Sequence, residues 1–190
     1  MGKLTYNHHF EGESMEAKYC KESRIVKMSH VLPPDTNTHG TLFGGKLMSY
    51  IDDVASLSAT RHSHRTVVTA STDSVHFLSP ITPNDAVMLE SYVVSTGRTS
   101  MEVFVKVIAE NLYTGERRIS ATSFLTLVAL DENNKPVPVP PVIPTTKEET
   151  KLHELAPQRA EMRKARRAES KEFASYLTTE DYHEQTKCET

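Results

Sequence analysis

The chain has 190 residues, a length that suits one domain with an appendage. No run of 18 apolar residues occurs, so we expect no membrane span, and a net charge of −3 argues against a protein built to coat nucleic acid. The two cysteines, Cys20 and Cys188, form no metal-binding pair, and the first residues contain no apolar signal segment. We therefore expect a reduced, cytoplasmic protein without a metal site.

Charged residues are distributed unevenly along the chain. The hydrophobic fraction is only 37%, but residues 144–190 hold 19 of the Lys, Arg, Asp and Glu side chains, about twice the density of the preceding part. Within that tail, a basic cluster over residues 159–171 alternates with acidic residues, which is typical of a solvated helix face. We expect a polar lead-in over residues 1–19, a globular domain over 20–135, and a Pro-rich linker with a charged helical tail over 136–190.

The first part of the domain predicts a strand, a loop and a long helix. Partly alternating apolar residues predict a strand over Glu22–Leu32, stopped by Pro33 and Pro34. The polar and glycine-rich stretch Asp35–Gly45 predicts a loop. Apolar and small residues then recur at i, i+3 and i+4 spacing, which predicts a helix over Gly45–His62 with one buried face.

Beyond the helix the sequence changes to β-branched residues in loose alternation, which predicts strands. Four are expected, over Thr66–Phe77, Asp85–Thr96, Ser100–Asn111 and Arg117–Leu130. Short glycine-containing links between the last three favour antiparallel hairpins. A second helix is expected over Lys147–Leu177, after the extended run Pro136–Pro141. The pattern predicts an α+β fold in which a curled antiparallel sheet wraps around one long central helix.

The glycine-rich loop before the helix is a candidate binding element. Gly44 and Gly45 lie where the helix begins, so unpaired N–H groups there could hold an oxyanion. The loop is not a phosphate loop, because the spacings GxxxxGK[ST] and GxGxxG are absent. Asn37 lies in the same loop, and we group it with the acid pair that follows in the helix.

Asp52 and Asp53 form that acid pair, two turns into the predicted helix. At about 100° per residue, Asp52 lies on the flank of the apolar face and Asp53 points almost opposite to it. A flanking carboxylate can border a pocket and act as a general base. The alternative is that Asp52 is a surface acid that pairs with Lys46 or Arg61.

Other constellations carry less chemical information. The residues His39, His62 and His64 lack the spacing of a metal site and are more simply exposed or capping side chains. No GxSxG motif supports a serine hydrolase. The turn Gly97–Ser100 offers N–H groups and the Arg98 guanidinium to a phosphate, or else is a solvated hairpin tip.

Several segments together resemble the acyl-CoA thioesterases of the hotdog fold, in the branch of the YciA-like enzymes and the cytosolic long-chain acyl-CoA hydrolases. The resemblance covers about residues 20–170 and rests on PPDTNTHGTLFGGKLMSYIDDVASLSATRH, VVTASTDSVHFLSPI, GRTSMEV and ATSFLTLVALDENNKPVPVPP. It implies a homodimer with one continuous sheet and active sites at the interface, and trimers of such dimers. It also implies hydrolysis of fatty acyl-CoA to free fatty acid and CoA, with no cofactor beyond the CoA of the substrate, and no nucleic-acid or membrane partner.

The resemblance also implies roles for particular residues. The family's catalytic asparagine falls on Asn37 and its catalytic aspartate on Asp52, and in the family the two meet across the dimer interface. Asp52 would activate water or attack through an anhydride, Asn37 would position the water or the thioester, and the N–H groups of Gly44 and Gly45 would stabilise the oxyanion. The segments that run along CoA in the family fall near Phe77 and on Arg98, Thr99 and Ser100. We expect Arg61 and Arg98 to bind the CoA phosphates.

Two other functions remain open at this point. The first is a non-catalytic hotdog protein that senses acyl-CoA or a nucleotide, against which the presence of both Asn37 and Asp52 argues. The second is a hotdog dehydratase, whose catalytic histidine lies in the helix region. In this sequence His62 stands only at the far end of the helix, which ranks the dehydratase low.

Overall fold

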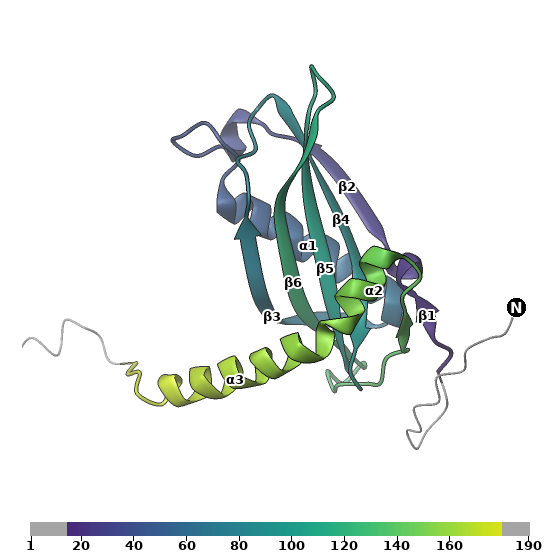
Figure 1. Ribbon diagram of the computed structural model, residues 1–190. Helices are drawn as coiled ribbons and strands as arrows, with labels where there is room; N and C mark the ends of the chain where they lie inside the picture. Colours follow the sequence, from purple (N-terminus) through teal and green to yellow (C-terminus); the bar gives the residue numbers. More distant parts are fainter. Residues whose placement is uncertain (1–14, 180–190) are drawn as a thin grey trace, which may run out of the picture. The chain divides into compact units, whose positions relative to one another are not determined.

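The computed structural model describes residues 15–179, so Cys188 and most of the expected lead-in lie outside the described residues. Five strands form one antiparallel sheet in the order β2-β4-β5-β6-β3 (Figure 1). Their bounds are Ile25–His30 for β2, Thr66–Phe77 for β3, Asp85–Thr96 for β4, Ser100–Asn111 for β5 and Arg117–Leu130 for β6. The four longer strands confirm the predicted bounds. The strand β2 is shorter than expected, because Cys20–Ser23 forms a turn of 3-10 helix (η1) before it.

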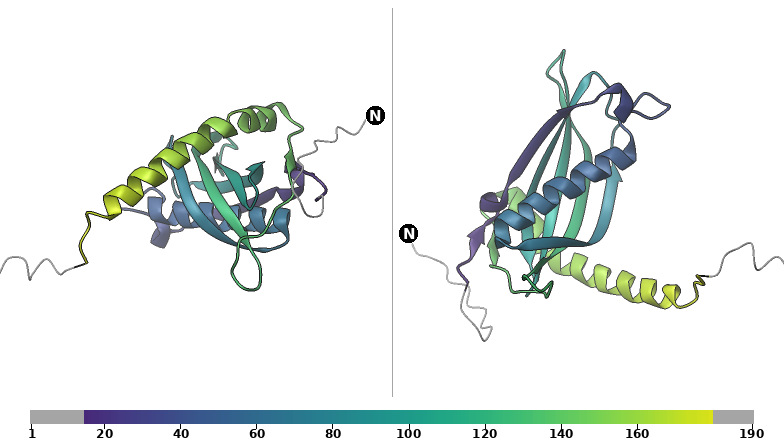
Figure 2. Two further views of the ribbon diagram at one scale, coloured as in Figure 1. Left: turned by 90° about the horizontal axis from the view of Figure 1, so that it is seen from below. Right: turned by 180° about the vertical axis from the view of Figure 1, so that it is seen from behind.

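The helix α1 spans Gly44–Ser63 and lies across one face of the sheet, as the right panel of Figure 2 shows. Its predicted apolar stripe is buried, together with two polar residues: Leu47, Ile51, Val54, Ala55, Ser58, Ala59 and His62. The Ser58 and Ser91 hydroxyl oxygens lie 2.7 Å apart, and Ser91 Oγ also donates to the Val54 carbonyl. Such short side chains let α1 approach β4 closely. The expected α+β fold, a sheet curled around one central helix, is confirmed.

The compact core extends further along the chain than the sequence predicted, past residue 135. The core unit ends at Glu154, and a second unit begins at Leu155, whereas we expected the domain to end at residue 135. A parallel pair joins β1 (Lys18–Tyr19) to β7 (Val142–Ile143), and Val139 and Val142 are buried. The prolines cannot extend a ladder, but the valines between them bury like core residues.

The expected single helix over Lys147–Leu177 is two helices, α2 (Lys147–Glu154) and α3 (Ala156–Ala174). Pro157 stands in the first turn of α3, where a missing N–H costs nothing, but inside a continuous helix it would remove a hydrogen bond. The helix therefore restarts at this point. In the second unit, most side chains of the basic cluster over residues 159–171 are exposed, which agrees with a solvated helix face.

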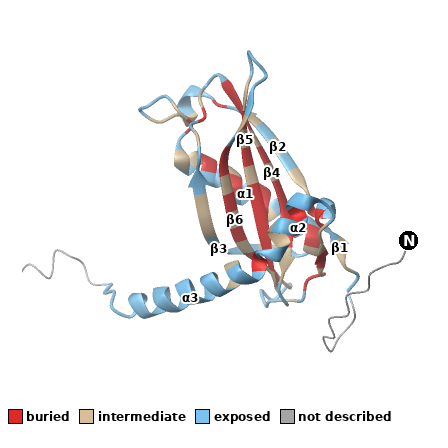
Figure 3. Ribbon diagram, viewed as in Figure 1, coloured by how far each residue is buried: buried red, intermediate tan, exposed pale blue. Residues whose placement is uncertain are grey.

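The helix α2 is held to the other face of the sheet by a buried carboxylate. Glu149 is 1% exposed and accepts hydrogen bonds from the N–H groups of Thr145 and Thr146, at 2.8 and 2.9 Å, and from Arg24 Nη2 at 2.9 Å. Burial raises its pKa, but these hydrogen bonds outweigh burial and hold the pKa of Glu149 below its ordinary value. Figure 3 shows α2 over the end of the buried central strands.

His62 gives the fold a pH dependence. Its ring is fully buried, Nε2 donates to the Pro140 carbonyl at 2.8 Å, and Nδ1 has no hydrogen-bond partner among the described residues. Burial, and secondarily the charge of Lys18, lower the pKa of His62 below its ordinary value, although the Pro140 bond opposes them. Folding therefore selects the neutral ring, so stability is complete above the unfolded pKa and falls as pH drops through it.

We expect the free energy of unfolding in urea to decrease through this ring as the pH falls below the ordinary pKa of histidine, about 6.5. The variant His62→Gln keeps an N–H donor for Pro140 and has no titrating group. Its stability should vary less with pH than that of the wild type. Equal pH slopes for the two proteins would contradict the assignment.

Two further expectations concern the membrane and the cysteines. Among residues 15–179, no helix is long and apolar enough to cross a membrane. Cys20 is a free, buried thiol, and burial together with nearby Glu149 raises its pKa to about 12. A thiol with so high a pKa is unreactive, so Cys20 fills space in the core.

Candidate active site

Asn37 closes the loop between β2 and α1. Its Oδ1 accepts hydrogen bonds from the N–H groups of His39 and Thr41, at 2.9 and 3.2 Å. Its Nδ2 donates to Thr41 Oγ1 at 3.0 Å, and Gly40 completes the turn at φ +69°. The backbone donors set the orientation of the amide, because Oδ1 is already occupied. One N–H of the Asn37 amide remains available to a ligand.

The same loop leads into a cavity at the start of α1. Asn37, Gly44 and Phe77 border a cavity of about 410 Å³. No side chain caps the helix at Phe43, so the first N–H groups of α1 lack a side-chain partner. A Cβ at Gly45 would stand 2.5 Å from the Phe43 ring, so a larger residue at this position would displace that ring.

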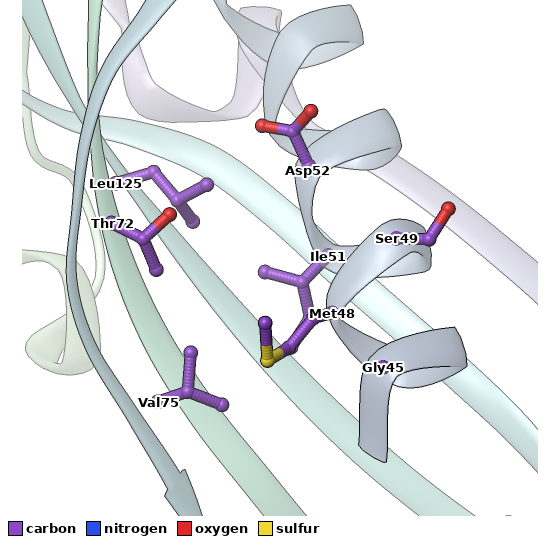
Figure 4. Close-up of a pocket in the computed structure, with 8 residues that line it drawn as sticks. All are labelled: Gly45, Met48, Ser49, Ile51, Asp52, Thr72, Val75 and Leu125. Carbon is purple, nitrogen blue, oxygen red and sulfur yellow. The ribbon is translucent and has the colours of Figure 1, made fainter. Parts of the chain in front are cut away.

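Asp52 borders a second cavity, of about 280 Å³, which is lined by residues of α1, β3 and β6. Figure 4 shows Met48 and Ile51 pointing from α1 toward Val75 and Leu125, with Asp52 at one end of this space. The cavity is therefore mostly apolar with a carboxylate at its rim, which is the usual character of a small-molecule site.

Thr69 on β3 determines the orientation of this carboxylate. Its hydroxyl donates to Asp52 Oδ1 at 2.7 Å and leaves Oδ2 for another partner. Asp52 is exposed in the single chain, as the surface-acid alternative expected, but it pairs with neither Lys46 nor Arg61. Lys46 pairs with Asp35 at 3.2 Å, and Arg61 donates to the Arg24 carbonyl at 2.6 Å.

The neighbouring acid, Asp53, forms an ion pair with Lys27 on β2 and is half exposed. This contact agrees with the prediction that Asp53 points away from the pocket. The two acids of the pair therefore have different surroundings, although they are adjacent in the sequence.

Within one chain, the structure does not bring Asn37 and Asp52 to the same cavity. Of the other predicted residues, Gly44 and Phe77 lie with Asn37, and Gly45 lies with Asp52. The predicted CoA contacts on other elements border neither cavity: Arg61, Arg98, Thr99 and Ser100. His39, His62 and His64 do not gather into a metal site, and the described residues contain no cluster of three or more potential ligands.

Thr69 was not among the predicted site residues. A threonine in a β-branched strand is expected from strand propensity alone, and no spacing connects it with a helix residue 17 positions earlier. The only signal is its place in the segment that resembles the family.

We expect Thr69→Val, which keeps the shape and removes the hydroxyl, to lower kcat about 10-fold to 100-fold with little change in KM. Thr69→Ser should restore most of the loss, because it returns the donor to Asp52. Steady-state kinetics of the two variants tests this, and full activity of Thr69→Val would show that the hydrogen bond is dispensable.

Comparisons with known proteins identify the family. The family model described as the Thioesterase superfamily matches residues 39–116. The uncharacterized acyl-CoA thioester hydrolase YkhA of Bacillus subtilis is 62% identical over 168 residues, which cover 88% of this chain and 98% of that protein. The crystal structure of an apo-hexameric acyl-CoA thioesterase has a TM-score of 0.79 and 53% identity, and covers 81% of this chain and 99% of its own.

An acyl-CoA hydrolase from Staphylococcus aureus is also similar. Its complex with butyryl coenzyme A, coenzyme A and coenzyme A disulfide has a TM-score of 0.82 and 45% identity, and covers 85% of this chain and 98% of its own. Three more structures of that enzyme carry single alanine substitutions of an asparagine, an aspartate and a threonine, spaced 15 and 17 residues apart.

An antiparallel sheet curled around one long helix with a buried face defines the hotdog fold. The family model matches residues 39–116, and YkhA aligns over 98% of its own length. These matches extend the assignment from the fold to the family. The chain belongs to the Thioesterase superfamily, as the resemblance predicted.

Proposed function

We propose that the protein hydrolyses the thioester of fatty acyl-CoA to a free fatty acid and CoA. The observation that carries the proposal is the Asp52 carboxylate, which Thr69 holds through one oxygen at the rim of an apolar cavity. Asn37, Asp52 and Thr69 are spaced 15 and 17 residues apart, as are the substituted residues of the Staphylococcus aureus enzyme. This equal spacing supports the three residues as one functional unit.

The active site is completed by a second subunit. The strand β3 is an edge of the sheet, with Val68 45% exposed, and Met48 and Leu57 on α1 are also about half exposed. An uncovered edge strand with apolar neighbours favours pairing with another copy. Pairing of β3 with the partner's β3 about a twofold axis would make one continuous sheet and bring Asn37 of one subunit toward Asp52 of the other.

The amide of Asn37 acts on the thioester carbonyl. Its Oδ1 is occupied by two backbone N–H groups, so the group that remains is an N–H donor. A donor polarises a carbonyl oxygen and stabilises the negative charge that develops on it. Of the two roles expected for Asn37, the geometry therefore favours positioning of the thioester over positioning of water. The N–H groups of Gly44 and Gly45 add to the same oxyanion site.

Asp52 acts on the water. Its Oδ2 accepts the proton of a water molecule whose oxygen attacks the thioester carbon, and collapse of the oxyanion breaks the carbon–sulfur bond and releases the CoA thiolate. Attack by Oδ2 itself, through an anhydride that water then opens, uses the same geometry. The acyl chain lies in the apolar cavity beside Ile51 and Leu125.

The CoA moiety extends away from this centre. Phe77 borders the cavity of Asn37 and is 56% exposed, which suits contact with the pantetheine arm. We propose that the phosphates of a CoA bound across the dimer contact four residues: Arg61, Arg98, Thr99 and Ser100. No step is assigned to a metal or a cofactor. We further propose that the dimers assemble as a trimer, as in the hexameric relative.

A panel of acyl-CoA substrates from two to eighteen carbons, with a thiol reagent that reports released CoA, tests the proposal. Turnover with at least one chain length is expected. CoA binding without release at every chain length would favour the non-catalytic sensor.

A further inference from the structure

The sheet face opposite α1 carries an apolar row that crosses four strands. In the strand register, Met28 on β2 stands opposite Met88 on β4, Met88 opposite Ile108 on β5, and Ile108 opposite Ile119 on β6. Directly opposed residues of neighbouring strands point to the same face. Met28 is 52% and Ile119 50% exposed, and the two residues between them are half-buried.

The orientation of this row follows from β4. Ser91 contacts α1 through Ser58, so it points to the inner face of the sheet. Side chains alternate along a strand, so Met88, three residues earlier, points to the outer face. Glu90 also points outward and pairs with Arg24, beneath α2. Figure 1 looks onto this outer face, where α2 covers only the end of the sheet beside β1.

The charges on both sides of the apolar row are already paired within the chain. One step toward α2, Glu90 and Lys106 lie 3.3 Å apart, and on the far side Glu110 and Arg117 lie 2.8 Å apart. The surface thus has an apolar centre rich in methionine and a polar rim, as protein interfaces do. Its paired rim offers little to a strongly charged partner, and its centre fits another apolar protein surface.

We propose that the outer-face row Met28–Met88–Ile108–Ile119 is the surface through which one dimer packs against a neighbouring dimer of the same chain. This inference rests on the trimer of dimers in the proposed function. The β3 edge closes about a twofold axis, so a hexamer needs a second interface elsewhere on the molecule. The hexameric relative, 53% identical to this chain, supports a second copy as the occupant.

Lysine substitutions test this surface on the full chain. The variants are Met28→Lys, Ile119→Lys and the double variant, and light scattering with sedimentation velocity measures their size. Both side chains are at least half exposed, so lysine fits the folded subunit. We expect a hexameric wild type, a hexamer dissociation constant raised about 100-fold or more in each single variant, and a dimer in the double variant.

Leu112→Lys is the matched control. Leu112 is a comparably exposed leucine, at 46%, in the hairpin between β5 and β6 and outside the row, and its substitution should leave the hexamer intact. The more conservative Ile119→Thr, which suits a strand, should weaken the hexamer in the same direction. A hexameric double variant, a monomeric one, or a wild type that is dimeric at micromolar concentration would each overturn the proposal. Because size is the readout, these outcomes are distinct from an absence of acyl-CoA hydrolysis.

Discussion

Replacement of Asp52 by asparagine is expected to lower kcat about a thousandfold, without unfolding the protein. The variant Asp52→Asn keeps an oxygen that accepts the Thr69 hydroxyl and keeps the volume of the side chain beside the apolar cavity. It loses the carboxylate oxygen that takes a proton from water or attacks the thioester. The measurement is steady-state release of CoA, with KM as a second parameter that should change little.

The adjacent residue supplies a matched control. Asp53→Asn makes the same chemical change one position along α1, at a side chain that pairs with Lys27 and borders neither cavity. Its kcat should stay within about twofold of the wild type, because an exposed ion pair contributes less than about 1 kcal/mol. Equal losses in the two variants would indicate a general effect of charge on the helix and not a catalytic role for Asp52.

Replacement of Glu149 by alanine is expected to cost about 3 kcal/mol of unfolding free energy or more, because it leaves buried donors without an acceptor. Glu149 accepts from two backbone N–H groups at the start of α2 and from Arg24, which also stacks on the Tyr92 ring. Its loss detaches α2 from the outer face of the sheet. Urea unfolding followed by circular dichroism measures the change.

Glu154→Ala is the control for this variant. Glu154 is exposed and ends the same helix, so its removal should change stability by less than about 0.5 kcal/mol. Glu149→Gln should lie between the two, because its amide oxygen can still accept a hydrogen bond. If Glu149→Ala is as stable as Glu154→Ala, the buried carboxylate does not hold α2 in place.

The sequence predicted the central sheet well because its strands are clearly delimited. Pro80 and Pro83 separate β3 from β4, and Gly97 and Gly115 lie in the two hairpins that follow. The pair of β1 with β7 could not be predicted, since two-residue strands have no periodicity and their partners are distant in sequence.

The start of α2 is marked in the sequence by a motif that was not among the predictions. Thr146 and Glu149 form a Thr-x-x-Glu capping box, in which the Thr146 hydroxyl accepts from the Glu149 N–H and the carboxylate accepts from the Thr146 N–H. This motif marks the start of a helix, whereas the break at Leu155 depends on the proline that follows.

The site was predicted in part, for a different reason at each residue. Helical geometry alone favoured Asp52 over Asp53, and the structure agrees. Asn37 came from the resemblance, because a loop asparagine has no pattern of its own. Thr69 was absent from the predicted site, because its contact with Asp52 joins a strand to a helix. The CoA contacts Arg61 and Arg98 stay proposals, since a site shared by two subunits is not visible in one chain's sequence.

The central claim is that one active site takes Asn37 from one subunit and Asp52 from its partner. Subunit mixing tests it most directly, with the two variants Asn37→Ser and Asp52→Ala, each nearly inactive alone. Serine retains an oxygen that can accept the loop N–H groups. When the variants are co-expressed, about half of the dimers are mixed, and each mixed dimer contains one site with both residues intact. About a quarter of wild-type turnover is therefore expected. Turnover no higher than that of the separate variants would contradict a shared site.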